Sequence, residues 1–203
     1  MNIFITSRLI KNITEEYDSI DRVWFEIFKN HNIFKSINHF DFMETNINNL
    51  KLSDLIIFTG GGDINILNEN NEDKIREQIE DKLIELSLEQ NKTIITICRG
   101  TQHMLFKMKK VEKFYKFKDN VNLESNLYSK NKDFKNLSDI IFHNKYGLTT
   151  DKDLVDFEFI HTYKGNRVAT LASKSNKIFS TFWHPERNNK FSFFEEAIQY
   201  LNK

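Results

Sequence analysis

The sequence contains little cysteine, proline or glycine and has no excess of either charge. Its one cysteine, Cys98, excludes an internal disulfide, which fits a reducing compartment. The 29 basic and 29 acidic residues cancel, so no overall charge indicates nucleic acid or an anionic membrane as a partner. No apolar run approaches the roughly 20 residues that span a bilayer. Residues 1–6 are typical of a short strand rather than a signal peptide, so we expect a cytoplasmic protein.

The length of 203 residues suits one domain, residues 1–203, and no repeat or linker interrupts it. Apolar spacing predicts amphipathic helices over residues 17–28, 69–90, 101–110 and 191–202, with a helical turn near residues 48–52. Strands are expected at residues 2–6, 33–42, 54–59, 93–97, 156–161, 167–173 and 177–183, with loops and short strands over residues 120–139. Strand, long helix and strand over residues 54–97 form a βαβ unit.

Three apolar strands end in residues that can carry chemistry. One runs into Gly60-Gly61-Gly62, one into Cys98 and one into His184-Pro185-Glu186. Ligands bind outside the carboxyl ends of the strands in an open α/β sheet. The pattern therefore predicts that all three groups lie at one edge of the sheet.

Each group also has a simpler interpretation. A lone cysteine at the end of a buried strand is commonly an inert core residue, and three glycines can form a plain tight turn. However, a strand-to-helix turn at Cys98 would expose the thiol and lower its pKa at the helix N-terminus. His184 would then take the thiol proton, and Glu186 would orient the imidazole.

The segments FTGGGD, ICRGTQ and FWHPE (residues 58–63, 97–102 and 182–186) together resemble the class I glutamine amidotransferases and γ-glutamyl hydrolases. The resemblance implies a three-layer α/β/α sandwich of flavodoxin-like type, with a largely parallel sheet and a small antiparallel extension late in the chain. It implies cleavage of a γ-glutamyl amide by a Cys98–His184–Glu186 triad through a glutamyl thioester.

The resemblance also implies the residues that surround the triad. The backbone N–H groups of Gly61 and Arg99 would form the oxyanion hole. Gly60, Gly62 and Gln102 would contact the glutamyl group, with an ordinary helical glutamine as the alternative for Gln102. His143 falls where the family has a histidine-containing loop, although it can also be an ordinary loop residue. The sequence departs from the family pattern at Ile140-Ile141, Thr96 and Thr59.

Basic residues suggest where an anionic substrate would bind. Arg8 follows the first strand and can face the substrate with Tyr17, Asp18 and Arg22, or can simply be solvated. Residues 107–118 carry six lysines, which form either a solvated hairpin edge or a cationic lip. The histidines lack the spacing of metal ligands, so we expect no metal and no organic cofactor.

No synthase domain is evident in this sequence, which leaves several functions open. Residues 5–8 and 19–24 resemble stand-alone family members from bacterial capsule pathways, which act on cytidine diphosphate-linked glutamine to give cytidine diphosphoramidate. That likeness implies a small-molecule substrate and no obligatory synthase partner. The alternatives are a glutaminase subunit that supplies ammonia to a separate synthase, and a relative that only binds a metabolite. The oligomeric state stays open.

Overall fold

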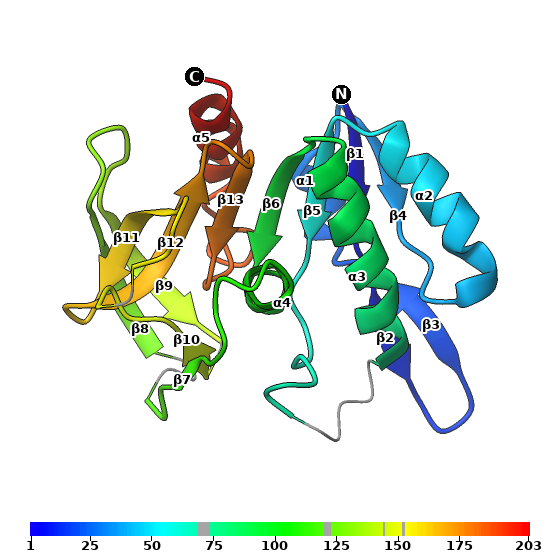
Figure 1. The fold of residues 1–203 in the computed structure, drawn as a ribbon, viewed down its shortest axis with the longest axis horizontal. Coiled ribbons are helices and arrows are strands. Elements are labelled where there is room, and N and C mark those ends of the chain that lie inside the picture. The colour runs from blue at the N-terminus through cyan, green and yellow to red at the C-terminus, as the bar shows by residue number, and fades with distance from the viewer. Residues whose placement is uncertain (69–73, 120–122, 144, 152) are drawn as a thin grey trace.

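The computed structural model describes residues 1–68, 74–119, 123–143, 145–151 and 153–203. These residues form a main sheet of nine strands in two parts (Figure 1). The parallel part has the order β4 (Asn32–Lys35), β1 (Asn2–Ile5), β5 (Leu55–Phe58), β6 (Thr93–Ile97) and β13 (Ile178–Thr181). The antiparallel part continues with β12 (Arg167–Ser173), β11 (Glu158–Tyr163), β8 (Leu123–Ser129) and β9 (Leu137–Phe142).

Helices cover both faces of the parallel part. Side chains alternate along each strand, so Ile3 and Ile5 of β1 join one apolar cluster and Phe4 joins another. The first cluster includes α1 (Val23–Ile27) and α5 (Ser192–Leu201), and the second includes α2 (Met43–Lys51), α3 (Lys74–Glu89) and α4 (Arg99–Lys107). Figure 1 shows α3 in front of the sheet and α2 beside β4 at the right edge. The expected three-layer α/β fold is confirmed.

The strands that end at the candidate site were predicted correctly. Every residue of β5 and β13 is buried, as continuous apolar runs in a parallel sheet require. The predicted helix at residues 69–90 corresponds to α3, and its first part, residues 69–73, lies outside the described residues. The predicted C-terminal helix corresponds to α5.

The helix expected over residues 17–28 is wrong in its first half. Residues 17–19 belong to β3 (Glu16–Ser19), which pairs with β2 (Arg8–Lys11) as an antiparallel hairpin. The Asp18 carboxylate accepts hydrogen bonds from the backbone and side chain of Asn38 and from the Ser7 hydroxyl. These tertiary contacts favour the strand, and only the short α1 remains helical.

The strand expected within residues 33–42 is β4, and a 3₁₀ turn, Phe40–Phe42, follows it. One further expectation is corrected. Residues 107–118 do not form a hairpin, because β7 (Tyr115–Lys116) pairs with the distant β10 (Tyr146–Gly147). Among the described residues, none of the helices combines the length and apolar character that crossing a bilayer requires.

Candidate active site

Cys98 occupies a strained turn between β6 and α4. Its φ of 52° is in the left-handed region, which a non-glycine residue adopts at a cost and mostly at functional sites. The backbone N–H of Cys98 donates to the carbonyl of Thr181 at 2.7 Å, which ties the turn to the end of β13. A Cβ atom at Gly100 would collide with the Phe58 backbone, so only glycine lets α4 start this close to β5. The turn presents a half-buried thiol at the carboxyl edge of the sheet.

A buried chain of hydroxyl groups explains how the turn accommodates Thr96. The Thr96 hydroxyl is 2.7 Å from that of Ser180 and 2.9 Å from that of Thr101. The Thr101 hydroxyl in turn donates to the Thr181 carbonyl at 2.7 Å. Hydrogen-bonded in this way, the hydroxyls of these three side chains are buried without a large desolvation cost.

His184 connects Cys98 to Glu186. Its Nδ1 lies 2.6 Å from Oε1 of Glu186. A Cβ atom built at Gly60 would lie 3.4 Å from Nε2 of His184 and 3.3 Å from Cβ of Cys98, so the ring lies beside the cysteine. Burial lowers the pKa of His184, but the negative charge of Cys98 and the contacts with Cys98 and Glu186 outweigh it and raise that pKa to about 9. The arrangement therefore favours the imidazolium form of His184 at neutral pH.

The glycine segment packs directly against this pair. A Cβ atom at Gly60 would lie 2.6 Å from Cε1 of His184 and 3.3 Å from Cβ of Cys98. Gly61 has a φ of 97°, and a side chain there would also collide with the aliphatic part of Arg8. Gly62 follows with a φ of 72°. Gly60 is thus required by close packing against His184 and Cys98, and Gly61 is favoured by its positive φ, which together exceed what a plain turn demands.

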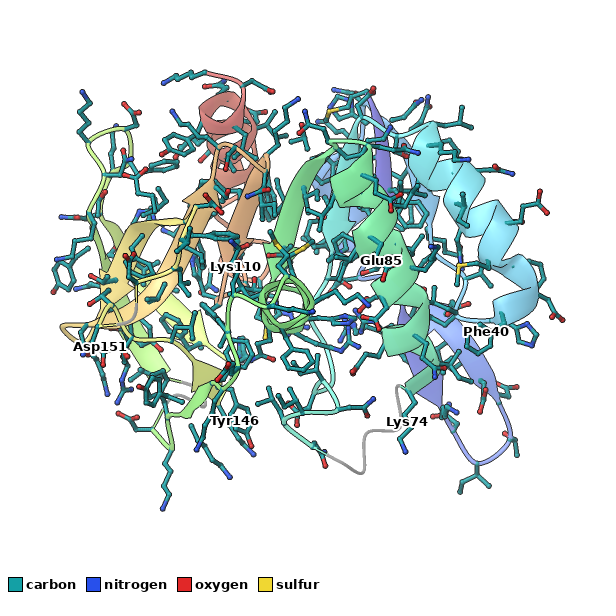
Figure 2. All side chains as sticks on the ribbon, viewed as in Figure 1. Phe40, Lys74, Glu85, Lys110, Tyr146 and Asp151 are labelled. Carbon is teal, nitrogen blue, oxygen red and sulfur yellow. The ribbon has the colours of Figure 1, made fainter. Side chains whose placement is uncertain are left out.

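Gln102 and His143 come from different elements, α4 and the segment after β9. Gln102 lies on the first turn of α4, and its amide nitrogen donates to the Tyr146 carbonyl at 3.1 Å. Figure 2 shows Tyr146 on the small β7–β10 sheet. The His143 ring centroid is 5.8 Å from that of His184. Burial and the positive charges of His184 and Arg187 lower the pKa of His143, so a neutral ring is favoured there.

Two arginines border a small hollow beside His184. The hollow is lined by residues that include Arg8, Thr59, Gly60, His184, Glu186 and Arg187. Of the residues expected to accompany Arg8, Asp18 is used within the fold, and the largely exposed Arg22 pairs with Glu26 at 3.4 Å. Arg187 was missed in the sequence, although its place directly after His184-Pro185-Glu186 is a usable signal.

The lysines of residues 107–118 are divided between two environments. Lys107 pairs with Asp81 and Glu85, and Lys110 with Asp156, so these two charges are partly neutralised. Lys113 and Lys116 instead line a separate cavity with Phe114, Tyr115 and Tyr146. The described residues contain no group of three or more acidic, histidine or cysteine side chains placed to hold a metal ion.

The sequence analysis also missed two buried charged residues on α3, Arg76 and Glu80. Both side chains are fully buried next to the glycine segment and Arg99. Their spacing of i and i+4 is typical of an exposed helical ion pair. However, Arg76 and Glu80 lie on the same face of α3 as the buried Ile79 and Leu83. Charged residues on the apolar face of a helix indicate buried charge and could have been noticed in the sequence.

Comparisons with known proteins identify the family and the fold of this chain. The family model Glutamine amidotransferase class-I matches residues 10–192. A γ-glutamyl-CDP-amidate hydrolase of Campylobacter jejuni is 26% identical over 193 residues, which are 93% of this chain and 92% of the relative. Among solved structures, PurLQS of Thermotoga maritima has a TM-score of 0.65 at 16% identity and covers 98% of both chains. A glutamine amidotransferase of Thermotoga maritima has a TM-score of 0.63 at 15% identity, covering 98% of this chain and 84% of that one. The chain belongs to the class I glutamine amidotransferase family.

Proposed function

We propose that this protein hydrolyses a γ-glutamyl amide through a Cys98–His184–Glu186 triad. The observation that carries the proposal is the grouping of Cys98, His184 and Glu186 at one edge of the sheet, with the histidine hydrogen-bonded to Glu186 and the cysteine on a strained turn. The raised pKa of His184 supports an imidazolium beside the nucleophile, where it can act as the general acid. The family membership supports an amidohydrolase.

The reaction proceeds in two halves. The Cys98 thiolate attacks the γ-carbonyl carbon, and the backbone N–H groups of Gly61 and Arg99 stabilise the oxyanion. The imidazolium of His184 gives its proton to the departing nitrogen, which leaves a glutamyl thioester on Cys98. A water molecule, deprotonated by His184, then attacks the thioester and releases L-glutamate. Glu186 holds the imidazole in the required tautomer throughout.

We further propose that the departing group is a nucleotide diphosphate carrying the amide nitrogen. Because His184 must reach that nitrogen, the departing group lies on the His184 side, where Arg8 and Arg187 border the hollow. Arginine forms charge-assisted, bidentate contacts with phosphate oxygens. The name of the Campylobacter jejuni relative, a γ-glutamyl-CDP-amidate hydrolase, supports cytidine diphosphate as the nucleotide.

The main alternative is a glutaminase subunit that delivers ammonia to a separate synthase. The likeness in fold to PurLQS is compatible with this alternative. It predicts that free glutamine is the better substrate and that a synthase partner raises its turnover. A relative that only binds a metabolite is the second alternative, and it predicts no turnover of any γ-glutamyl compound.

The deciding experiment compares glutamate release from the CDP-linked γ-glutamyl amide and from free glutamine, without a partner. We expect the conjugate to have the larger kcat/KM, with the margin shrinking as salt rises because its phosphate contacts are screened. Arg8→Ala should reduce this margin, whereas Arg22→Ala, a neighbouring arginine that pairs outside the hollow, should not. Equal rates that salt does not change would contradict the nucleotide substrate and leave a general γ-glutamyl amidase.

A further inference from the structure

Four charged or titratable side chains form a buried ion cluster behind the candidate active site. Arg76 and Glu80 come from α3, and Arg99 and His103 come from α4. None of them is more than 2% exposed. Burying charge is costly unless the groups are paired, so each of these side chains depends on the others to be tolerated in the core.

Arg76 binds the glycine segment through its carbonyl groups. Its Nη1 atom donates to the carbonyls of Gly60 at 3.3 Å and Gly61 at 3.1 Å, and its Nη2 atom donates to the Thr59 carbonyl at 3.0 Å. Nη2 also lies 3.2 Å from the Thr59 hydroxyl. One guanidinium thus fixes three successive peptide groups and also contacts the hydroxyl of Thr59.

The carbonyl contacts determine where the N–H groups point. In a trans peptide the C=O and N–H bonds point in opposite directions, and the described residues contain no cis peptide. The Gly60 carbonyl faces Arg76, so the Gly61 N–H faces away from it. Gly60 itself packs against Cys98 and His184. The Arg76 contact with the Gly60 carbonyl therefore keeps the Gly61 N–H pointing away from the arginine, which leaves this donor available to a group bound beside Cys98.

The peptide between Gly60 and Gly61 is otherwise easy to rotate. Glycine occupies positive and negative φ with similar ease, so neither flanking residue resists a flip of this peptide. A flip would replace the N–H donor with a carbonyl oxygen, which would repel a developing oxyanion. The Arg76 side chain opposes this flip because its Nη1 atom donates to the Gly60 carbonyl.

Glu80 links this arginine to the second half of the oxyanion hole. Its Oε1 accepts from Nε of Arg76 at 2.8 Å, while Oε2 contacts the Arg99 guanidinium and lies 3.1 Å from Nδ1 of His103. Burial alone would raise the pKa of Glu80, but Arg76, Arg99 and His103 hold it well below its usual value. Since Arg99 directly follows Cys98, one carboxylate holds both segments whose N–H groups would bind the oxyanion.

We propose that Arg76, held by Glu80, is a positioning residue that keeps the Gly60–Gly61 peptide in its oxyanion-binding orientation. This inference rests on the proposed hydrolysis of a γ-glutamyl amide. Arg76 does not touch the substrate. It acts through the glycine segment, and the predicted defect is therefore in transition-state stabilisation, not in substrate binding or in the thiol.

The test uses Arg76→Lys, which retains the charge but loses the planar, multiple donation to carbonyls. Loss of one oxyanion donor lowers kcat by about 10²-fold or more, so we expect a loss of about 10²-fold with little change in KM. Alkylation of Cys98 by iodoacetamide, including its pH profile, should match wild type, because it needs the thiolate but no oxyanion hole. The matched control is Arg167→Lys. Arg167 lies on β12, away from the buried ion cluster, and pairs with Asp119.

A second variant separates positioning from folding. Arg76→Ala should be slower still, and added guanidinium ion should restore part of its kcat by occupying the vacated place between the carbonyls and Glu80. Turnover of Arg76→Lys within about threefold of wild type would overturn the inference. Equal losses of turnover and alkylation would overturn it too, because they indicate a collapsed site. Wild-type protein that releases no glutamate contradicts the proposed function itself, whereas active wild type with equally active Arg76→Lys contradicts only this inference.

Discussion

The parallel and antiparallel parts of the sheet contribute different kinds of residue to the site. The parallel strands β5, β6 and β13 are buried almost throughout and end at the glycine segment, Cys98 and His184. In the antiparallel part, β8 alternates between exposed and partly buried positions, with only Leu127 fully buried, and β9 leads to the exposed His143. On the proposed function, the reacting groups therefore rest on the enclosed part, whereas the proposed substrate-binding residues Arg8, His143 and Arg187 lie on more exposed segments.

The largest effect on rate is expected at the end of β13. His184→Asn removes both the general base and the acid that protonates the departing nitrogen, and should lower kcat by about 10³-fold or more. Glu186→Gln should cost less, because the histidine stays in place with poorer orientation. Steady-state glutamate release measures both losses. A near-native kcat for His184→Asn would contradict the proposal that the reacting groups lie on the parallel part of the sheet.

The next largest effect is expected on stability. Glu80→Gln leaves two buried arginines without their carboxylate, and breaking a buried pair in this way costs about 3–5 kcal/mol. Urea unfolding measures the change in free energy. Glu85→Gln is the matched control on the exposed side of the same helix and should leave the unfolding midpoint unchanged. Equal midpoints for the two variants would show that the buried ion cluster does not stabilise the parallel part.

The pH dependence of the reaction follows from His184. Its folded pKa of about 9 lies above the ordinary value of 6.5, so the imidazolium persists at neutral pH and is lost as pH rises through 9. The stabilisation from its contacts is complete below about pH 6.5 and disappears over the same rise. We expect kcat to fall above pH 9 in a pH–rate profile. A rate that increases steadily to pH 10 would contradict the assignment of His184 as the acid.

The smallest effect is expected from the antiparallel part. His143 is exposed and its ring lies beside that of His184, so His143→Ala should change KM by less than about tenfold and kcat very little. Steady-state kinetics on the γ-glutamyl conjugate separates the two parameters. A loss of kcat as large as that of His184→Asn would make His143 a participant in the reaction and remove the contrast between the two parts.

The sequence was most informative about the parallel part. Apolar runs such as residues 54–59 and 177–183 predicted buried strands, and their shared direction predicted that Gly60, Cys98 and His184 meet at one edge. That argument needs only local pattern and the rule for α/β sheets. It says nothing of side-chain orientation, which is why the sequence could not show that Gly60 packs against both Cys98 and His184.

The failures of prediction have a common physical cause in tertiary contact. Residues 17–22 have helical spacing, but pairing with β2 and the contacts of Asp18 make a strand and a turn. Arg76 and Glu80 look like an exposed i, i+4 pair until α4 supplies Arg99 and His103. Local patterns cannot report partners that are distant in sequence, and this buried ion cluster consists of such partners.

The most direct test of the account is the covalent state of Cys98 during turnover. Protein quenched in acid shortly after mixing with the γ-glutamyl conjugate should gain the mass of one glutamyl group, on the peptide that contains Cys98. Cys98→Ala should fold, release no glutamate and gain no mass. Undiminished glutamate release by Cys98→Ala would contradict the central claim that a thioester on this residue carries the reaction.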